Sequence, residues 1–476
     1  MRVCLISREY PPDTAWGGIA TFSYHLALGL AALGHEVEVV TLSLTVAQTQ
    51  TTDGILVHRV VAEDFPANWA VVQTLPTGDY VLKSLRALWQ KFLERHRVRP
   101  FDVVDVPEHL AAEGLLVAIT RIAPLLVRLY TPFSRFIAER LHNACRCFDH
   151  QLVAASERAL MLTADVLTSP SQELADYVAT YLRLPRETVA IVRNPVDTTV
   201  FCPEGPRALA SDGRMTVLFV GRLEERKGPR ELVQAIPAVL QSCPNVRFVL
   251  LGSDTDTGPE NSSVKAELET LIHKLGCADA ISFHPPVPLG ILPQWYRSAD
   301  VSVVPSVYDN SPYTCLEAMA CGRPVVGTTA GGTREYVIDE VSGLIVPPRD
   351  PSRLAGALSR LLQDGRLRRE MGEQARRRAV EHFSPEEIAR QTVSLYELAR
   401  ESFSRRDFRA IYDGRPDCLG KDLEGVLGAF EQSMARAVHA RLAAKEQGSW
   451  RSLSCRLNNR LTRLVLRIRK RLGKIS

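Results

Sequence analysis

The sequence predicts an α/β protein with two doubly wound, Rossmann-like domains and a helical C-terminal extension. Short β-branched runs alternate with longer amphipathic runs, as in strands joined by crossover helices in a parallel sheet. The alternation breaks between residues 194 and 214, where proline and glycine collect, and then begins again with a new first strand. At 476 residues the chain is also too long for one core.

The first domain is expected to contain parallel strands that alternate with helices. Its first helix, from residue 20 to 33, is expected to stop at Gly34. The expected strands cover residues 3–7, 37–42, 56–61, 101–106, 125–130, 166–169 and 189–192.

The second domain repeats this alternation and is followed by helices. Its expected strands cover residues 216–220, 246–251, 280–284, 301–305, 324–327 and 344–346. A helical run from residue 351 to about 400 follows, and two further helices are expected at residues 424–444 and 450–475.

Charge and cysteine content narrow the class of protein. The formal charge is +4, but residues 448–476 contain nine Lys or Arg and no acid, so the rest of the chain is mildly acidic. This distribution argues against an enzyme that binds nucleic acid. The ten cysteines form no C-x-x-C pair, and neither a signal peptide nor a membrane-spanning run is apparent. Reduced thiols and a cytoplasmic location are therefore expected.

In each domain, the segment after the first strand carries groups that suit a phosphate. Gly17 and Gly18 lie between a strand and a helix, where backbone amides can approach an anion. Arg222 and Lys227 follow the first strand of the second domain, at the edge where open α/β sheets bind ligands, and together they suit a diphosphate. Considered alone, Gly17-Gly18 fits a flexible loop without a ligand at least as well as a phosphate site. Likewise, Arg222 and Lys227 considered alone fit ordinary solvated charges at least as well. A dinucleotide site is disfavoured because G-x-G-x-x-G follows neither first strand.

A helix start after residue 310 is a second candidate anion site. Ser311 is expected to be the N-cap and Pro312 the first helical residue. The unpaired amides at the helix start would then belong to Tyr313, Thr314 and Cys315.

Two carboxylates flank this helix start. Glu317 falls one turn into an apolar helix, where a buried carboxylate needs hydrogen-bond donors, and the hydroxyls of a ribose would supply them. Asp309 precedes the expected cap and is expected to face the same cleft. Taken alone, Asp309 also fits an acid that interacts with the helix dipole, and Glu317 a core acid satisfied within the protein.

The order of these motifs resembles the signature of glycosyltransferase family 4, which has the GT-B fold. Asp309 and Glu317 are separated by seven residues, and Ala-Met-Ala-Cys-Gly-Arg-Pro-Val-Val and Ala-Gly-Gly-Thr-Arg-Glu335 follow. Other segments agree with the family pattern, namely Gly17-Gly18, residues 194–203, Gly221-Arg222 with Lys227-Gly228, residues 339–347, and Phe383-Ser384-Pro385. The resemblance covers residues 1 to about 400 in unbroken order.

The resemblance implies a retaining transferase with two domains that face each other across a cleft. Residues 1–200 would bind the acceptor, 214–385 the nucleotide sugar, 386–402 would form a crossover helix, and 403–476 a helical extension. A sugar would pass from a nucleoside diphosphate sugar to a saccharide, lipid-linked or other acceptor, in cell-envelope or polysaccharide biosynthesis. No cofactor and no metal site are expected, and the oligomeric state is left open. A catalytically impaired relative that only binds sugar nucleotides or carbohydrates is the alternative.

The resemblance also implies roles for single residues. Arg222 and Lys227 resemble the diphosphate-binding pair, and Gly18 resembles the loop residue whose amide lies near the phosphates. Tyr313 and Thr314 at the helix start would bind the same phosphates. Glu317 resembles the ribose ligand. Asp309 occupies the first acidic position, usually Glu in the family, whose counterpart contacts the donor sugar.

Two further positions, Tyr130 and Pro312, depart from the family pattern. Tyr130 stands where a histidine is frequent, and a tyrosine that titrates near pH ~10 is a poor base at neutral pH. His109 is a second candidate for the cleft, although a histidine at a strand end also fits a structural role. Pro312 stands where glycine is frequent and has no amide to offer. A front-face mechanism, in which the departing phosphate takes the acceptor proton, would need no base.

The C-terminal tail is expected to be a basic amphipathic helix. Apolar residues follow one stripe from 450 to 475, and arginines flank it. Such a helix fits peripheral contact with an anionic membrane, at the inner face of the cytoplasmic membrane. Packing on the protein itself or on a second copy fits the stripe equally well.

Overall fold

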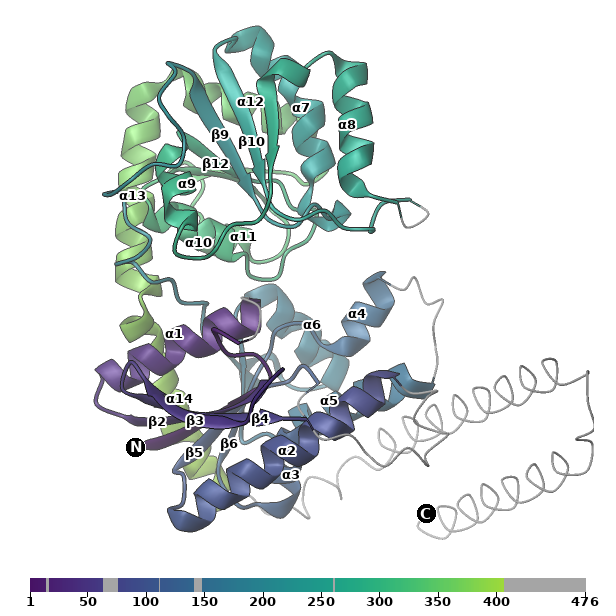
Figure 1. Ribbon diagram of the computed structural model, residues 1–476, viewed down its shortest axis with the longest axis vertical. Coiled ribbons are helices and arrows are strands. Elements are labelled where there is room, and N and C mark those ends of the chain that lie inside the picture. Colours follow the sequence, from purple (N-terminus) through teal and green to yellow (C-terminus); the bar gives the residue numbers. More distant parts are fainter. Residues whose placement is uncertain (14–16, 63–75, 111, 141–147, 260–261, 406–476) are drawn as a thin grey trace, which may run out of the picture.

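The computed structural model describes residues 1–13, 17–62, 76–110, 112–140, 148–259 and 262–405. These residues form two α/β domains, one above the other in Figure 1, which confirms the predicted fold class. The helices predicted at 424–444 and 450–475, with the proposed membrane contact, lie outside the described residues. No helix in the described ranges is both long and apolar enough to cross a membrane.

The N-terminal domain is built on an eight-stranded sheet with the order β3-β4-β2-β1-β5-β6-β7-β8. Its strands are β1 (Arg2–Ser7), β2 (Glu36–Ser43), β3 (Gln48–Thr52), β4 (Ile55–Val61), β5 (Val103–Pro107), β6 (Leu125–Arg128), β7 (Val166–Ser169) and β8 (Val189–Ile191). All neighbours are parallel except β3, which pairs antiparallel with β4. The sequence does not predict β3, because Gln-Thr-Gln-Thr-Thr lies exposed at the edge and has no apolar alternation.

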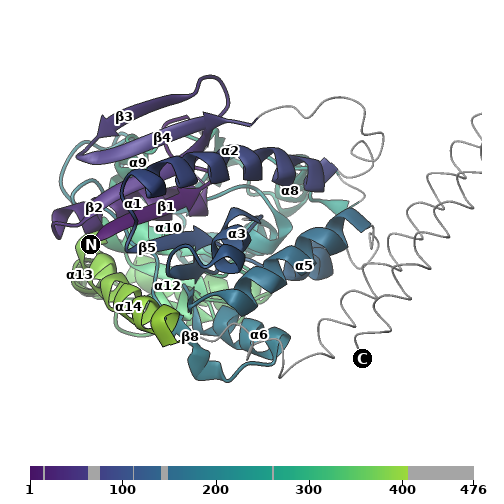
Figure 2. The ribbon, with the colours of Figure 1, turned by 90° about the horizontal axis from the view of Figure 1, so that it is seen from below.

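Helices cover both faces of this sheet, which is why its central strands are apolar on both sides. One face packs against α1 (Gly18–Ala32) and α14 (Pro385–Arg405). The other face packs against α2 (Pro76–Val98), α3 (Ala112–Thr120), α5 (Phe148–Thr163) and α6 (Gln172–Leu182), while α4 (Phe133–Arg140) contacts α5. Figure 2 views this domain from below, with α14 at the left and α5 at the right.

The C-terminal domain is built on a six-stranded, fully parallel sheet with the order β11-β10-β9-β12-β13-β14. Its strands are β9 (Met215–Val220), β10 (Val246–Leu251), β11 (Ile281–His284), β12 (Val301–Val304), β13 (Val325–Thr328) and β14 (Gly343–Val346). One face packs against α7 (Pro229–Ser242), α8 (Val264–Leu275) and α12 (Pro351–Gln363). The other face packs against α9 (Leu292–Ser298), α10 (Tyr313–Ala320) and α13 (Gly365–Phe383), and the short α11 (Thr333–Tyr336) follows β13.

Both sheets reverse their strand order at one point. The reversal lies between β1 and β5 in the N-terminal sheet and between β9 and β12 in the C-terminal sheet. In open α/β sheets, ligands bind at such points, outside the carboxyl ends of the strands. A ligand-binding site is therefore expected among the loops that follow these four strands.

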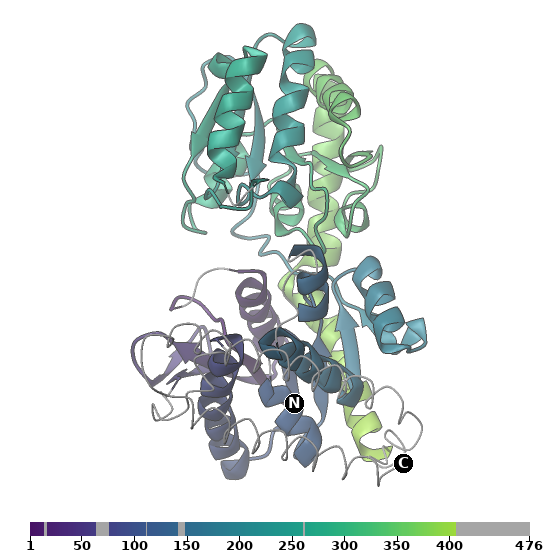
Figure 3. The ribbon, with the colours of Figure 1, turned by 90° about the vertical axis from the view of Figure 1, so that its right-hand side faces the viewer.

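The last two helices return the chain to its starting domain. α13 buries Ala375, Ala379 and Phe383 in the C-terminal core, and α14 then buries Ile388 and Tyr396 in the N-terminal core. In Figure 3 these helices, in light green, run along both domains. The approach of α14 to α1 is close, because a Cβ placed on Gly29 would lie 2.2 Å from the carbonyl oxygen of Pro385.

We expect Gly29→Ala to lower the free energy of unfolding by about 1–3 kcal/mol, because the added methyl group overlaps backbone atoms of α14. Gly356→Ala is the matched control, since Gly356 also lies inside a helix but its added Cβ would meet no atom within 4 Å. The control is expected to be neutral or to stabilise by up to about 1 kcal/mol through helix propensity. Urea denaturation of both variants measures the difference. Equal effects of the two substitutions would contradict the close packing of α1 against α14.

Candidate active site

A short 3₁₀ turn after β9 brings Lys227 to Asp309. The turn spans Glu225–Lys227, and the carbonyl oxygen of Arg226 accepts hydrogen bonds from the amides of Val307 and Tyr308 at 2.8 and 3.2 Å. These bonds fasten the loop after β9 to the loop after β12. The Lys227 ammonium then forms an ion pair with the buried Asp309 carboxylate.

The Asp309 carboxylate is held in its ionised form. Burial by itself would raise the pKa of this group, but the charges of Lys227 and Arg226 outweigh burial and bring the pKa below its usual value. The Arg226 guanidinium lies 3.8 Å from the second carboxylate oxygen. Lys227 is therefore already partly neutralised before any ligand binds.

Two glycines after β13 give the loop around Asp309 its shape. A Cβ on Gly331 would lie 1.9 Å from the carbonyl oxygen of Asp309, and one on Gly332 would lie 2.1 Å from that of Asn310. The amide of Gly332 donates to the Asp309 carbonyl oxygen at 2.9 Å. Larger residues at either position would push this loop away, and Gly331 also has a positive φ of 60°.

Glu317 lies on α10 with one oxygen satisfied by the protein. The Tyr296 hydroxyl donates to Glu317 Oε2 at 2.7 Å. Burial raises the pKa of Glu317 to about 7, against the lowering effects of the Tyr296 hydrogen bond and the Lys227 charge. The second oxygen has no partner among the described residues, so it remains available to a ligand.

The start of α10 differs from the prediction. Pro312, not Ser311, is the N-cap, and it makes no side-chain capping bond. The predicted cap is wrong because the Ser311 hydroxyl instead bonds the Tyr336 hydroxyl. The amide of Cys315 is not free either, since it donates to the Pro312 carbonyl oxygen at 3.1 Å.

Two free amides remain at this helix start, those of Tyr313 and Thr314, which donate to no described residue. The positive end of the helix dipole lies at the same place. The predicted anion site is therefore present with two free amides, whereas the sequence predicts three.

Arg222 stands apart from this cluster. Its guanidinium contacts Glu224 at 2.7 Å, and its side chain is 56% exposed. The structure brings Lys227, Asp309 and Glu317 together but leaves Arg222 at the rim, where a flexible side chain can reach an incoming ligand.

The N-terminal domain reaches the site through Gly18. Gly18 is the first residue of α1, and a Cβ at this position would lie 4.0 Å from the ring of Tyr313. Tyr313 packs against the cores of both domains. The Gly17-Gly18 loop and the start of α10 therefore face each other across the boundary between the domains.

Asn310 ties the two domains together beside this contact. Its side-chain amide donates to the carbonyl oxygen of Tyr130, and its side-chain oxygen accepts from the hydroxyl of Ser171. Nearby, Glu335 forms an ion pair with Arg193 and accepts hydrogen bonds from the amide of Gln172 at 2.9 and 3.0 Å.

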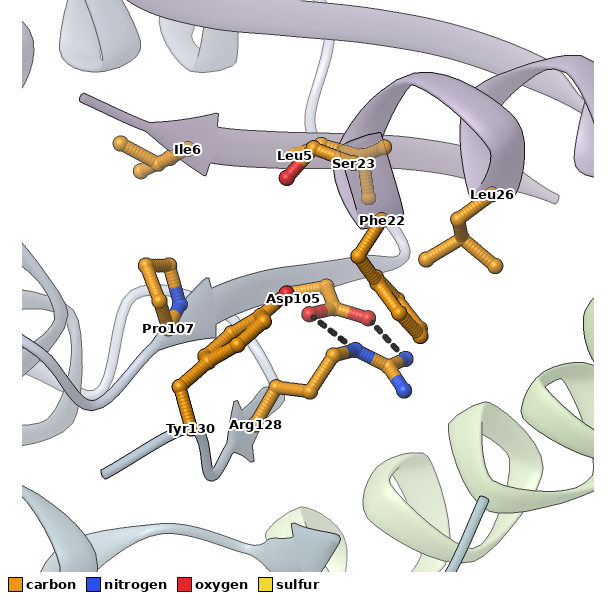
Figure 4. Close-up of a pocket in the computed structure, with 9 residues that line it drawn as sticks. All are labelled: Leu5, Ile6, Phe22, Ser23, Leu26, Asp105, Pro107, Arg128 and Tyr130. Atoms are coloured by element: carbon orange, nitrogen blue, oxygen red, sulfur yellow. Dashed lines mark hydrogen bonds and ion pairs between the residues drawn. The ribbon is translucent and has the colours of Figure 1, made fainter. Parts of the chain in front are cut away.

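Tyr130 lies over a small pocket beneath α1. Figure 4 shows Tyr130 beside the Arg128–Asp105 ion pair, whose shorter contact is 2.6 Å. The amide of Tyr130 donates to both carboxylate oxygens of the buried Glu108 at 2.8 Å. Burial raises the pKa of Tyr130 well above its usual value, so the phenol stays protonated at neutral pH and is no general base there.

His109 is also a weak base. Burial, followed by the charge of Arg8, lowers the pKa of His109 to about 4. The imidazole lies 3.7 Å from Glu157 and packs near Phe133, with ring centroids 6.4 Å apart. These contacts fit a structural role, and among the described contacts His109 has none with Lys227, Asp309 or Glu317.

No sequence pattern identifies Asn310 or Tyr296 as part of this site. Tyr296 belongs to α9, and only the packing of α9 against α10 brings its hydroxyl to Glu317. Asn310 directly follows Asp309, and this position next to an expected site residue is the one feature of the sequence that could have pointed to it. Its partners lie in the other domain, so the contacts themselves could not be predicted. Within the described part of the chain, no group of three or more metal-ligating side chains lies together.

Comparisons with known proteins agree with this architecture. The family model described as Glycosyltransferase Family 4 matches residues 16–200, and the one described as Glycosyl transferases group 1 matches residues 205–378. The D-inositol 3-phosphate glycosyltransferase of Xylanimonas cellulosilytica is 30% identical over 411 residues, which cover 80% of this chain and 92% of that protein.

Solved structures share the fold at lower identity. Sucrose-phosphate synthase from Thermosynechococcus elongatus has a TM-score of 0.65 and 24% identity, over 83% of this chain and 98% of that chain. The Anabaena protein HepE, crystallised with UDP-glucose, has a TM-score of 0.60 and 18% identity, over 83% and 99% of the two chains. Identities this low bear on the fold alone. With both of its domains matched by family models, the chain belongs to glycosyltransferase family 4 and has the two-domain GT-B fold.

Proposed function

We propose that the chain is a retaining glycosyltransferase that takes a sugar from a nucleoside diphosphate sugar. The observation that carries this proposal is the meeting of Lys227, Glu317 and two free helix-start amides at the reversal point of the C-terminal sheet. The ammonium and the amides suit a diphosphate, and the unpartnered Glu317 oxygen suits a ribose hydroxyl. The UDP-glucose complex of HepE, which has the same fold, supports a nucleotide-sugar donor.

In this proposal the reaction is driven by stabilisation of the leaving group. The bond between the sugar C1 and the diphosphate oxygen breaks, and negative charge grows on the diphosphate. Lys227, the amides of Tyr313 and Thr314, and the exposed Arg222 stabilise that charge. The acceptor oxygen forms the new bond to C1 on the same face, and its proton passes to the departing phosphate. This route suits a site in which Tyr130 and His109 are poor bases at neutral pH.

The acceptor is proposed to be a saccharide, a lipid-linked saccharide or another hydroxyl-bearing molecule, as in cell-envelope or polysaccharide biosynthesis. The relative from Xylanimonas cellulosilytica is named for D-inositol 3-phosphate, so cyclic polyols and their phosphates belong among the acceptors to be tested. The basic stripe expected in residues 450–475 fits an acceptor held at a membrane surface.

A thermal-shift panel of UDP, GDP and ADP with their sugars tests donor binding directly. A ligand that binds only the native state raises the melting temperature, so the matching nucleotide is expected to stand out. If none of these compounds shifts the melting temperature, the proposed donor site is wrong. Binding without turnover would instead favour the alternative, a relative that binds nucleotide sugars but no longer transfers them.

We expect Lys227→Ala to reduce the release of nucleoside diphosphate by about a hundredfold or more, because it removes a fixed cation from the leaving group. Glu317→Ala is expected to raise the KM for the donor about tenfold or more, through the lost ribose contact. Lys274→Ala is the control, since Lys274 is exposed in the last turn of α8, away from the cleft. Steady-state release of the diphosphate measures all three variants. Equally slow release by the wild type and the two site variants would count against catalysis.

The affinity for UDP-glucose is expected to fall as the pH is lowered from 8 to 6. A carboxyl group with a pKa of about 7 is mostly ionised at pH 8 and mostly protonated at pH 6, and only the ionised form accepts strong hydrogen bonds from the ribose. The fall should reach up to about tenfold in the wild type. UDP-glucose itself does not titrate between these pH values, so calorimetric titration reports on the protein.

In Glu317→Gln the affinity should be lower at pH 8 and nearly independent of pH. If the variant retains the pH dependence of the wild type, the titrating group is another residue and the assignment of Glu317 to the ribose loses its support.

A further inference from the structure

Glu9 occupies a fixed position just after β1, at the reversal point of the N-terminal sheet. The Ser7 hydroxyl donates to the Glu9 carbonyl oxygen at 2.8 Å, and the Glu9 amide lies 3.4 Å from the same hydroxyl. Its carboxylate lies against Gly17, because a Cβ placed on Gly17 would be 2.9 Å from Glu9 Oε2. The backbone of the loop is thus held, and the side chain is directed to the start of α1.

This position borders the proposed donor site from the opposite domain. Gly18, next to Gly17, faces the ring of Tyr313 at the start of α10. The charge of Glu9 also reaches Tyr130: burial is the main cause of the raised pKa of that phenol, and Glu9 contributes further. The Glu9 carboxylate therefore lies in the space between the Gly17-Gly18 loop and Tyr130.

No described residue compensates the Glu9 carboxylate. It forms no ion pair and accepts no hydrogen bond within the described part of the chain, although it is only partly exposed. Burial raises its pKa above the usual value, with no opposing contribution from a cation. Water still reaches this carboxylate, and a ligand that displaces the water must supply a hydrogen-bond donor in its place.

The arginines at this sheet edge are already paired. Arg8 contacts Glu113 at 3.4 Å, and Arg128 contacts Asp105 at 2.6 Å. Arg59 contacts Asp13 at 3.6 Å and donates to the Tyr10 carbonyl oxygen at 3.0 Å. Each of these arginines thus has a carboxylate partner, although Nη1 of Arg128 makes no hydrogen bond. Glu9 is the charged group at this edge that has no partner of opposite charge among the described residues.

We infer that Glu9 binds the acceptor substrate, by accepting a hydrogen bond from a hydroxyl of an uncharged sugar or polyol ring. This inference rests on the proposed function, because it assumes that the donor occupies the cleft beside Tyr313. A phosphate on the acceptor ring would meet the Glu9 charge, and the described arginines at this edge are each paired with an acid that weakens their attraction for it. The enzyme should therefore prefer a neutral acceptor ring to its phosphorylated counterpart.

The test compares neutral and phosphorylated acceptors in matched pairs: glucose and glucose 6-phosphate, mannose and mannose 6-phosphate, myo-inositol and D-inositol 3-phosphate. The donor is the nucleotide sugar that gives the largest thermal shift. Kinetics are measured on the full chain for the wild type, Glu9→Gln and Glu9→Asp. Glu187→Gln is the matched control, because Glu187 is an exposed acid in the turn before β8, at the opposite edge of the same sheet.

The wild type is expected to use the neutral member of at least one pair with the higher kcat/KM. Glu9→Gln should raise the KM for that acceptor about tenfold or more, because a charged hydrogen-bond acceptor is replaced by a neutral one. The KM for the donor and the nucleotide-induced thermal shift should stay within about twofold of the wild type, which also shows that the variant is folded. Glu9→Asp should keep the preference for the neutral ring, and Glu187→Gln should behave as the wild type.

Three results would overturn the inference while leaving the proposed function intact. These are a preference of the wild type for the phosphorylated members, a wild type that binds the nucleotide sugar but uses none of the six acceptors, and a Glu9→Gln variant that changes the KM for the donor instead of the acceptor. A wild type that shows no nucleotide-induced thermal shift would contradict the proposed function itself.

Discussion

The ion pair between Lys227 and Asp309 is the interaction on which the rest of the site depends. It joins the loop after β9 to the loop after β12, the two strands between which the C-terminal sheet reverses its order. Both groups are largely buried, and loss of one partner from such a pair typically costs about 3–5 kcal/mol, because the other charge is left uncompensated. The pair therefore fixes the ammonium near the start of α10, so the diphosphate of the proposed donor would meet a cation that is already in place.

Two carboxyl groups near this ammonium have pKa values that are shifted in opposite directions. Asp309 contacts Lys227 directly, and its pKa is lowered despite burial. Glu317 is bonded to the neutral Tyr296 hydroxyl instead, and burial dominates, so its pKa rises to about 7. One acid is thus a permanent counter-ion, and the other can change its charge near neutral pH. Pairs of acids whose environments separate their pKa values in this way are typical of sites that bind or transform ligands.

The sequence predicts the framework better than the details of the site. Buried parallel strands such as β1 and β10 consist of continuous apolar residues, so their positions could be read from the chain, whereas the polar edge strand β3 could not. The Ser311 cap failed for a comparable reason: local sequence favoured it, but the Tyr336 hydroxyl competes for the same side chain. Partners that come from another helix or another domain, such as Tyr296 for Glu317 and Tyr130 for Asn310, depend on packing that no local pattern encodes.

The two domains bring opposite charges to their shared boundary. The C-terminal side offers the free amides of α10 beside the Lys227–Asp309 pair, while the N-terminal side offers the Glu9 carboxylate beside arginines that are paired with acids. The helix-start amides therefore suit an anion on the C-terminal side, and the Glu9 carboxylate suits a hydroxyl donor on the N-terminal side. Gly18 and Tyr313 lie close together at this boundary, so the proposed donor would place its diphosphate toward α10 and its sugar toward the N-terminal domain. In the proposed reaction, this arrangement of charges and amides would direct the bond between sugar and diphosphate toward the acceptor without a catalytic base.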